Sequence, residues 1–508
     1  MVNRQSNWSR RAVLKSGLLV AGLARCGPAS AKTPAHSSSN AVRLKLDAIG
    51  QAVKSETRAG RATGISISVA EKGIIVWEGG FGFARRETAR PATAHTPFSL
   101  ASITKTFTAA AVMRLVEAGK LELDAPINRY LRSQLPRSSF ETKSVTLRRL
   151  GGHAAGMPSL FKMFDEKRAP TGIADLIRDY GELAYPAGER YEYANLGYSL
   201  LGEAVSHITG REFSASLKEL IIRPMGLYDT FFDTDPSRMR SAAGRYDQND
   251  REIPFYTTAT PPSGELYASA HDLSIFAANM MGMGSHGRSP LLGGKALDAL
   301  FAPVFTSGTK AFTTFGWSGR DLAGERIIVK TGGQPGVAAR LTLLPSRKIS
   351  IAVIANRNDN RELVASVSSE IAAALIKDWS NPDFQMNDPA APGAEIPGLD
   401  GSWTGSIRNG DKSRSAKIVV NAAGASTCTV GNGGARPIRE MANRSGTLTF
   451  KVDGDFSAVA ATDGAERQLD FKLVARNGSL AGRGLSVCDR PGFTLTEPHI
   501  VTLSRSSE

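Results

Sequence analysis

The sequence of 508 residues predicts an α/β (α+β) protein: an antiparallel sheet flanked by helices, with an α-helical lobe, followed by an all-β region. Strand-like segments stand at both ends of residues 41–378, with helical patterns between them, as in a sheet covered by helices. Residues 399–508 alternate short β-like runs with Gly, Asn and Asp turns, which is typical of a small sandwich or barrel. Residues 379–398 are rich in Pro, Asn and Asp without periodicity, so we expect a linker there.

Two hairpins and one helix define the expected sheet. Residues 64–82 contain two strand patterns joined at Lys72-Gly73, and residues 338–356 contain a second such pair. The segment 362–378 that follows has the spacing of an amphipathic helix. Strands at both ends of one domain, with helices between, predict that the helical lobe is inserted into the sheet.

The β-rich region after the linker has no pattern of catalytic residues. Its β-like runs are residues 415–420, 446–452, 468–474 and 499–504. We therefore expect a barrel-like accessory domain at residues 399–508. Cys428 and Cys488 lie here, and both a single disulfide and two buried free thiols stay open, because spacing alone does not show whether their Cα atoms approach.

Residues 1–31 have the three parts of a secretory signal peptide: a basic start, a short apolar core and small residues at 29–31. The paired arginines at 10–11 resemble the twin-arginine export signal. Cys26 suggests lipoprotein processing, which Arg25 disfavours because a small residue is needed there; a cytosolic basic helix is a further alternative. No other segment is apolar enough to cross a membrane, so we expect a periplasmic or secreted protein without a transmembrane anchor.

Charge and motifs argue against several classes of function. The formal charge is +14, and the five basic residues of 1–31 reduce it to 14 − 5 = +9 in a processed chain. No dense Lys/Arg run with aromatic residues occurs, so we expect no nucleic-acid partner. The sequence has no G-x-S-x-G, P-loop or H-E-x-x-H motif. The histidines show no paired ligand spacing, so we expect no metal and no cofactor: His36, His95, His153, His207, His271, His286 and His499. We expect His153 to be structural.

The pattern Ser-x-x-Lys occurs twice, in different surroundings. A glycine follows Ser307, and the residues after Lys310 have no helical period, so we expect a loop there. After Ser102 and Lys105, one helical face carries apolar residues and Gly119 ends the segment. The residues of this face are Phe107, Ala111, Leu115 and Ala118.

A serine and a lysine in the first turn of such a helix can form a nucleophile and its base. Residues i and i+3 share one face, so the Lys105 amine reaches the Ser102 hydroxyl. Burial and the positive potential of the helix start disfavour the ammonium and lower the pKa of Lys105. A serine needs such a base to become a nucleophile.

Two further segments supply polar groups. Tyr193 and Asn195 lie on a short polar turn before the apolar helix Leu200–Val205. Tyr193 could relay protons if cationic neighbours lower its pKa, and Asn195 could orient Lys105 and bind a substrate amide. The alternative is a packed tyrosine beside an asparagine that caps the helix.

The third segment is 330–332, Lys-Thr-Gly, after the strand-like residues 326–329. On a strand lining a cleft it offers a cation, a hydroxyl and a glycine that permits close approach to the backbone. The alternative interpretation is a turn.

The order Ser-x-x-Lys, Tyr-x-Asn, Lys-Thr-Gly resembles the family of class C β-lactamases, DD-peptidases and related esterases, over roughly residues 45–377. The resemblance implies a β-lactamase/transpeptidase-like fold with Ser102 as nucleophile and Lys105 with Tyr193 as the base system. It implies an oxyanion hole made by the backbone N–H groups of Ser102 and Gly333. The substrate-binding residues would be Asn195, Lys330, Thr331 and Gly332. Many relatives carry His in place of Lys330, and segment 151–156 departs from the family pattern.

These observations predict an exported serine hydrolase that cleaves amide bonds through an acyl-enzyme, with peptides containing D-amino acids as the favoured substrates. A β-lactamase or an esterase is the alternative within the family, and a non-catalytic, penicillin-binding-like sensor is the alternative outside enzymes. Lys330 and the +9 charge favour a substrate with a carboxylate. The expected partner is a small molecule or a peptide; the oligomeric state stays open.

Overall fold

The computed structural model describes residues 40–506 except 137, 166–170, 233, 285–286, 323, 378, 381, 383, 385, 387–394, 422–423, 445, 455–466, 477 and 491–492. The predicted signal peptide and much of the predicted linker lie outside the described residues. In the described part of the chain, no helix is both long and apolar enough to span a membrane.

The centre of the molecule is a nine-stranded antiparallel sheet in the order β3-β2-β1-β14-β13-β12-β11-β10-β9. Its strands are β1 (Gly64–Glu71), β2 (Ile74–Arg85), β3 (Arg90–Pro91), β9 (Phe305–Thr306), β10 (Ala311–Thr313), β11 (Ser318–Leu322), β12 (Glu325–Gln334), β13 (Val337–Leu344) and β14 (Ile349–Ala355). Both predicted hairpins are confirmed. In the first, Lys72 and Gly73 have φ angles of 51° and 80°, which suit a tight primed turn. The first hairpin pairs with the last strand through β1 and β14, so the two ends of the domain share one sheet.

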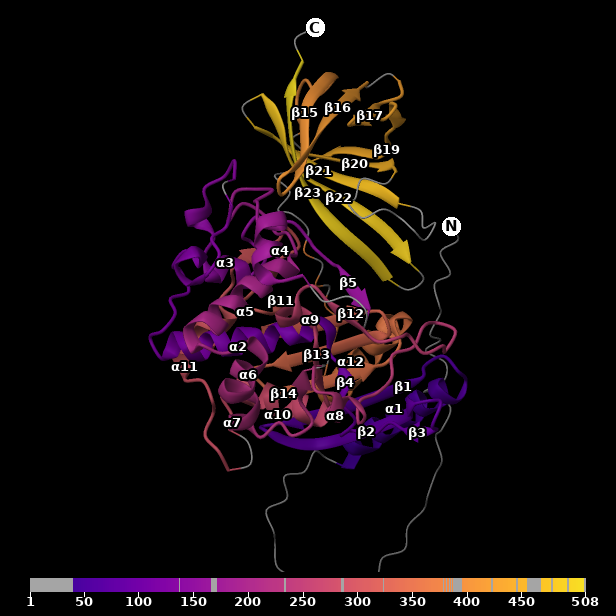
Figure 1. The fold of residues 1–508 in the computed structure, drawn as a ribbon. Helices are drawn as coiled ribbons and strands as arrows, with labels where there is room; N and C mark the ends of the chain where they lie inside the picture. Colours follow the sequence, from indigo (N-terminus) through magenta and orange to yellow (C-terminus); the bar gives the residue numbers. More distant parts are fainter. Residues whose placement is uncertain are drawn as a thin grey trace, which may run out of the picture.

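Helices cover both faces of this sheet (Figure 1). The helices α1 (Asn40–Arg58) and α12 (Arg361–Leu375) pack on one face, where Val53 and Ile371 are fully buried. The opposite face carries α10 and the inserted lobe. The remaining helices are α2 (Thr104–Glu117), α3 (Leu147–Gly151), α4 (Ile173–Tyr180), α5 (Asn195–Thr209), α6 (Phe213–Leu217), α7 (Arg223–Met225), α8 (Pro236–Met239), α9 (Pro261–Gly264), α10 (Ala270–Met280) and α11 (Gly294–Phe301). The predicted fold class, with its helical lobe, is confirmed.

Two short sheets join segments of the lobe. They consist of β4 (Phe98–Ser99), β8 (Leu266–Ala268) and β6 (Phe231–Phe232) in one, and β5 (Met163–Asp165) and β7 (Tyr256–Thr258) in the other. Strand β4 leads directly to Ser102, so its pairing with β8 fixes the chain just before the expected nucleophile.

The helix predicted after Ser102 is confirmed, but its burial differs from the prediction. Residues 104–113 are buried on every side, whereas Ala118 at the end of the expected apolar face is exposed. Alanine and threonine side chains let other helices approach α2 closely all round, so no polar face remains. Ser102 lies in a 3₁₀ turn (Ala101–Ile103) immediately before α2, not within it.

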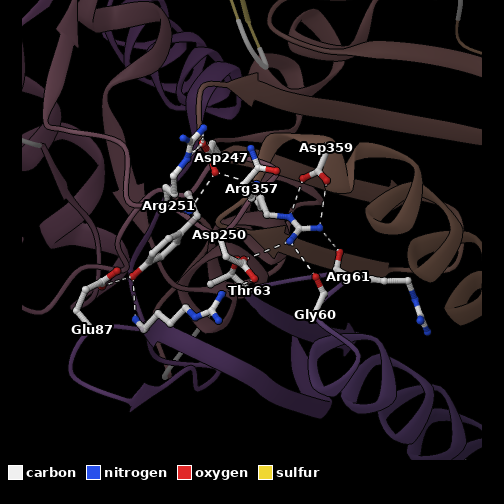
Figure 2. A network of polar contacts seen from close by, with 12 residues as sticks. Gly60, Arg61, Thr63, Glu87, Asp247, Asp250, Arg251, Arg357 and Asp359 are labelled. Carbon is white, nitrogen blue, oxygen red and sulfur yellow. Dashed lines mark hydrogen bonds and ion pairs between the residues drawn. The ribbon is translucent and has the colours of Figure 1, made fainter.

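A polar network ties the end of α1 to the start of α12 (Figure 2). The buried Arg357 guanidinium donates to the carbonyls of Gly60 and Arg61 at 3.1 and 2.6 Å. It also pairs with Asp250 at 3.2 Å and with Asp359 at 2.8 Å. Because α12 begins directly after this network, the network fixes the position of the first residue of the helix.

The C-terminal region forms a second nine-stranded sheet, nearly closed into a barrel, as predicted (Figure 1). The order is β18-β17-β16-β15-β23-β22-β21-β20-β19. The strands are β15 (Gly401–Asn409), β16 (Lys412–Val420), β17 (Thr427–Val430), β18 (Arg436–Pro437), β19 (Arg439–Arg444), β20 (Thr447–Asp453), β21 (Arg467–Arg476), β22 (Ser479–Arg490) and β23 (Phe493–Arg505). Cys428 and Cys488 are both buried and free, so the alternative of two free thiols is the one observed.

This sheet rests on the helical lobe, next to α3 and α4 in Figure 1. Tyr185 packs with Val474 and Ile500 in a small shared core. The backbones of Phe161 and Thr496 form a β-bridge with bonds of 3.0 Å in both directions. The two regions are therefore joined by apolar packing and by backbone hydrogen bonds.

Candidate active site

Ser102, Lys105, Tyr193 and Asn195 meet in space as the sequence predicts. The Ser102 Oγ lies 3.1 Å from the Lys105 Nζ and 2.8 Å from the Tyr193 hydroxyl. Asn195 Oδ1 accepts a hydrogen bond from Lys105 Nζ at 2.8 Å. Ser307, the serine of the second Ser-x-x-Lys pattern, lies in the turn between β9 and β10 and bonds to Thr309, so the loop prediction is confirmed.

Lys105 is completely buried, and its surroundings explain why it can serve as a base. Burial lowers the pKa of Lys105 well below its usual range, and the charge of Lys330 lowers it further. The Lys105 amine donates hydrogen bonds of 2.8 Å to Asn195 Oδ1 and to the Ser263 carbonyl oxygen. Both oxygens can only accept hydrogen bonds. A neutral amine has two N–H groups and one lone pair. With both N–H groups used, the lone pair is left for the Ser102 proton.

Asn195 lies within a helix, not on the turn before it that the sequence predicted. It is the first residue of α5, which runs to Thr209 and so begins earlier than the expected segment Leu200–Val205. Its side chain does not cap the helix. The amide oxygen holds Lys105, and the amide nitrogen donates to the Leu160 carbonyl at 2.8 Å. The sequence underestimated this helix because glycine and polar residues occupy its first turn.

Tyr193 is a hydrogen-bond donor to Ser102, and its pKa moves opposite to the direction expected from cationic neighbours. Lys105 Nζ and Lys330 Nζ lie 5.0 and 5.4 Å from the centroid of its ring. Burial nevertheless raises the pKa of Tyr193, and the hydrogen bond to Ser102 offsets only part of that rise. The raised pKa of the phenol favours its protonated form, which leaves Lys105 as the candidate base.

Strand β12 carries the Lys-Thr-Gly segment past Ser102. Lys330 is buried, 6% exposed, and burial lowers its pKa to about 7. Thr331 faces solvent. A Cβ on Gly332 would lie 2.1 Å from the carbonyl oxygen of Leu100. The glycine is thus needed for the close approach of the chain's own backbone at Leu100. This contact brings β12 and the Ser102 turn together.

Three residues near the site escaped the sequence analysis as functional groups. Arg361 is exposed, and its guanidinium Nη2 would lie 2.9 Å from a Cβ on Gly333, so it covers this glycine. His153 is buried as expected, with its ring 4.2 Å from that of Tyr193 and its Nδ1 accepting from Ala194 N–H. Glu192, directly before Tyr193, pairs with Arg483 and Lys472 of the C-terminal sheet.

The family model described as Beta-lactamase matches residues 49–375, which is more than half of the chain. The chain belongs to the beta-lactamase family. The match falls within the span of the resemblance seen in the motifs, and it covers every residue of the three motifs. The beta-lactamase family domain therefore carries the complete arrangement of Ser102, Lys105, Tyr193 and Lys330.

Two curated relatives show different degrees of similarity. "Putative beta-lactamase-like 1" of Homo sapiens is 28% identical over 350 residues, which are 65% of this chain and 69% of the relative. "Esterase EstB" of Burkholderia gladioli is 32% identical over 212 residues, which are 38% of this chain and 53% of the esterase. The chain thus spans about two thirds of the first relative and about half of the second.

A solved structure shares the fold over most of the chain. A crystal structure of SurE with D-Leu superposes with a TM-score of 0.62 at 21% identity, covering 90% of this chain and all of SurE. This coverage exceeds the part matched by the beta-lactamase family model, so the likeness extends into the C-terminal region.

Proposed function

We propose that this protein is an exported serine hydrolase that cleaves amide bonds through an acyl-enzyme, with D-amino-acid-containing peptides as its substrates. The observation that carries the proposal is the Ser102 hydroxyl held between the Lys105 amine and the Tyr193 phenol. A serine in contact with a buried neutral amine is an activated nucleophile. The export signal proposed for residues 1–31 would bring the enzyme to the periplasm or the medium, where such peptides occur.

From these contacts we infer the following proton movements during acylation. Ser102 Oγ attacks the substrate carbonyl while its proton passes to the Lys105 lone pair. The carbonyl oxygen becomes an oxyanion, for which the backbone N–H groups of Ser102 and Gly333 are the proposed donors. As the tetrahedral intermediate collapses, the leaving amine takes a proton from Tyr193, whose hydroxyl lies next to the Ser102 oxygen. Lys105 then returns its proton to Tyr193. Water reverses these steps to release the acid.

Two observations support an anionic amide substrate over a neutral ester. Arg361 presents an exposed guanidinium over Gly333, and Lys330, on the same strand, has its Nζ 5.4 Å from the centroid of the Tyr193 ring. A carboxylate beside the scissile bond, as in peptides that end in a D-residue, would bind there through charge-assisted hydrogen bonds. The D-Leu in the SurE structure adds support for D-amino acids. The similarity to EstB keeps ester hydrolysis as the second candidate.

The nucleophile can be tested with paired serine substitutions. Purified protein should turn over at least one member of a panel of D-alanyl dipeptides, D-aminoacyl amides, nitrocefin and p-nitrophenyl esters. Ser102→Ala should abolish turnover and labelling by a fluorophosphonate probe, whereas Ser307→Ala, in a turn of the same fold, should leave both unchanged. Loss of activity in Ser307→Ala, with activity kept in Ser102→Ala, would refute the assignment.

The same panel separates an enzyme from a sensor. A sensor would be acylated once at Ser102 and stay acylated, because its acyl-enzyme does not react with water. Multiple turnovers per protein molecule on any member of the panel would exclude the sensor. A stable adduct with every probe, found by mass spectrometry, would replace the hydrolase proposal with a binding function.

A further inference from the structure

Two histidines and a glutamate that are far apart in the sequence converge on the side of the sheet opposite α1 and α12. Glu78 lies in β2, His95 in the loop between β3 and β4, and His271 in the first turn of α10. One potential ligand atom from each of the three lies within 4.8 Å of the other two. The Glu78 carboxylate is 3.7 Å from His95 Nε2 and 3.0 Å from His271 Nδ1. The Nε2 of His95 and the Nδ1 of His271 therefore face the same carboxylate.

A fourth residue orients the cluster. Asp229 Oδ2 lies 3.2 Å from His95 Nδ1, the ring nitrogen that does not face Glu78. A carboxylate on Nδ1 holds the proton there and leaves the Nε2 lone pair for a cation, as in carboxylate–histidine–metal arrangements. Asp229 is itself held, because its backbone N–H donates to the buried Asp272 at 2.7 Å.

Backbone contacts hold the three supporting segments together. The His271 N–H donates to the Ala94 carbonyl at 3.1 Å, so the His95 loop is fastened to α10. Helix α10 packs on β1 and β2, near the lower edge of the molecule in Figure 1. Side-chain exposures of 28% for Glu78, 56% for His95 and 24% for His271 leave the cluster open to ions from solvent.

We propose that Glu78, His95 and His271 form a binding site for a divalent transition-metal cation, of which Zn²⁺ fits best. Imidazole and carboxylate are ligands that Zn²⁺ accepts, and three protein ligands leave the fourth position for water. The absence of paired ligand spacing in the sequence does not exclude the site, since its ligands come from separate elements. A bound cation would join β2, the His95 loop and α10. It would stabilise the fold at a site separate from Ser102.

The test is metal binding to the full-length protein after chelator treatment and dialysis. With Co²⁺ alone, wild type should bind one equivalent at this site and develop visible d–d bands, which Zn²⁺ should displace. The double variant His95→Gln/His271→Gln should lose this equivalent and the bands. Asp229→Asn should bind about ten- to a hundredfold more weakly, the usual effect of removing a carboxylate that orients a ligand. His207→Ala, an exposed histidine outside the cluster, is the matched control and should bind like wild type.

Thermal unfolding gives a second readout that does not depend on activity. Saturating Zn²⁺ should raise the Tm of wild type and of His207→Ala and leave that of the double variant unchanged, because a ligand that binds only the folded state stabilises it. The Tm measured without metal shows whether the double variant folds. Failure of wild type to bind Co²⁺, or equal binding by wild type and a folded double variant, would overturn the proposal. Neither result bears on Ser102, so it leaves the hydrolase proposal intact.

Discussion

Lys330 lies in β12 and Arg361 lies over the same strand, but the two basic side chains differ in burial. Lys330 is buried, with its ammonium over the Tyr193 ring, so its charge acts on the groups around Ser102. Arg361 is exposed at the start of α12, and its guanidinium lies above Gly333. Of the two, Arg361 is the more accessible to a substrate carboxylate, although the sequence analysis favoured Lys330.

A pair of substrates shows which of these two residues binds the carboxylate. Wild type should prefer an acid-terminated substrate over its amide-capped twin by one to two powers of ten in kcat/KM, about 1.4 to 2.8 kcal/mol. Removal of the residue that binds the carboxylate should abolish this preference, so Arg361→Ala and Lys330→Ala are compared. Equal rates on both substrates in the wild type would contradict a carboxylate site.

The pH dependence of that preference gives an independent answer. Burial lowers the pKa of Lys330 to about 7, so Lys330 is charged below that pH and loses its charge above it. If Lys330 binds the carboxylate, the preference for the acid should be present below about pH 7 and should fall as the pH rises through it. If Arg361 binds it, the preference should persist, because arginine stays charged throughout this range.

At the scale of elements, one contact brings β12, with its Lys-Thr-Gly segment, against the turn that carries Ser102. Gly332 touches the Leu100 carbonyl, and Ala101 after it has a φ of 45°, in the left-handed region that costs energy for a residue with a side chain. The strained turn at Ala101 is therefore in direct contact with β12 at Gly332. Ser102 is the next residue after Ala101.

Gly332→Ala tests this contact. The added methyl group would lie 2.1 Å from Leu100 O, so either β12 or the Ser102 turn must move. We expect a loss of about 1 to 3 kcal/mol in the free energy of unfolding, together with a large drop in kcat. Gly294→Ala is the matched control, because Gly294 lies in α11 with no atom near its Cβ position. That variant should be neutral or slightly more stable, as measured by denaturant unfolding.

At the scale of the whole molecule, the C-terminal sheet reaches the segment before Tyr193 through ion pairs between the buried Glu192 and two partly buried basic residues. Glu192 is 6% exposed and pairs with Arg483 and Lys472, one residue before Tyr193. The β-bridge at Phe161 lies next to Leu160, whose carbonyl holds Asn195. The accessory sheet thus contacts both segments that position polar groups around Lys105.

Arg483→Leu should destabilise the protein by about 3 to 5 kcal/mol, because it leaves most of the Glu192 charge uncompensated in the interface. The double variant Glu192→Gln/Arg483→Leu should recover part of this loss in a thermal unfolding experiment. Arg439→Leu, which breaks an exposed ion pair with Asp453 in the same sheet, should change stability by less than about 1 kcal/mol. Equal losses of stability in Arg483→Leu and Arg439→Leu would contradict a stabilising role for the ion pair of Arg483 with Glu192.

Removal of the whole C-terminal region should have a milder effect on folding than Arg483→Leu has. We expect limited proteolysis to cut within residues 379–398 and the fragment 1–378 to stay folded, because truncation exposes Glu192 to water rather than burying it unpaired. Turnover should fall, since the segment before Tyr193 loses its support. The absence of cleavage in this segment, or an unfolded fragment by circular dichroism, would contradict a separable domain.

The sequence by itself determined the hairpins at 64–82 and 338–356 and the helix after Ser102, and it predicts Ser102 as the nucleophile. These features depend on local periodicity, on turn residues and on the fixed geometry of residues three apart in a helix, all of which a linear pattern contains. The order of the three motifs then indicated the family.

Only the tertiary structure decided which groups surround those motifs. Arg361 reaches Gly333 and His95 meets His271 because the central sheet pairs strands from both ends of its domain and packs helices across its faces. Arg483 reaches Glu192 because the C-terminal sheet packs on the helical lobe. Burial likewise raises the pKa of Tyr193, and the hydrogen bond to Ser102 offsets only part of that rise. Contacts and burial of this kind depend on which distant segments the fold brings together, so no local pattern could reveal them.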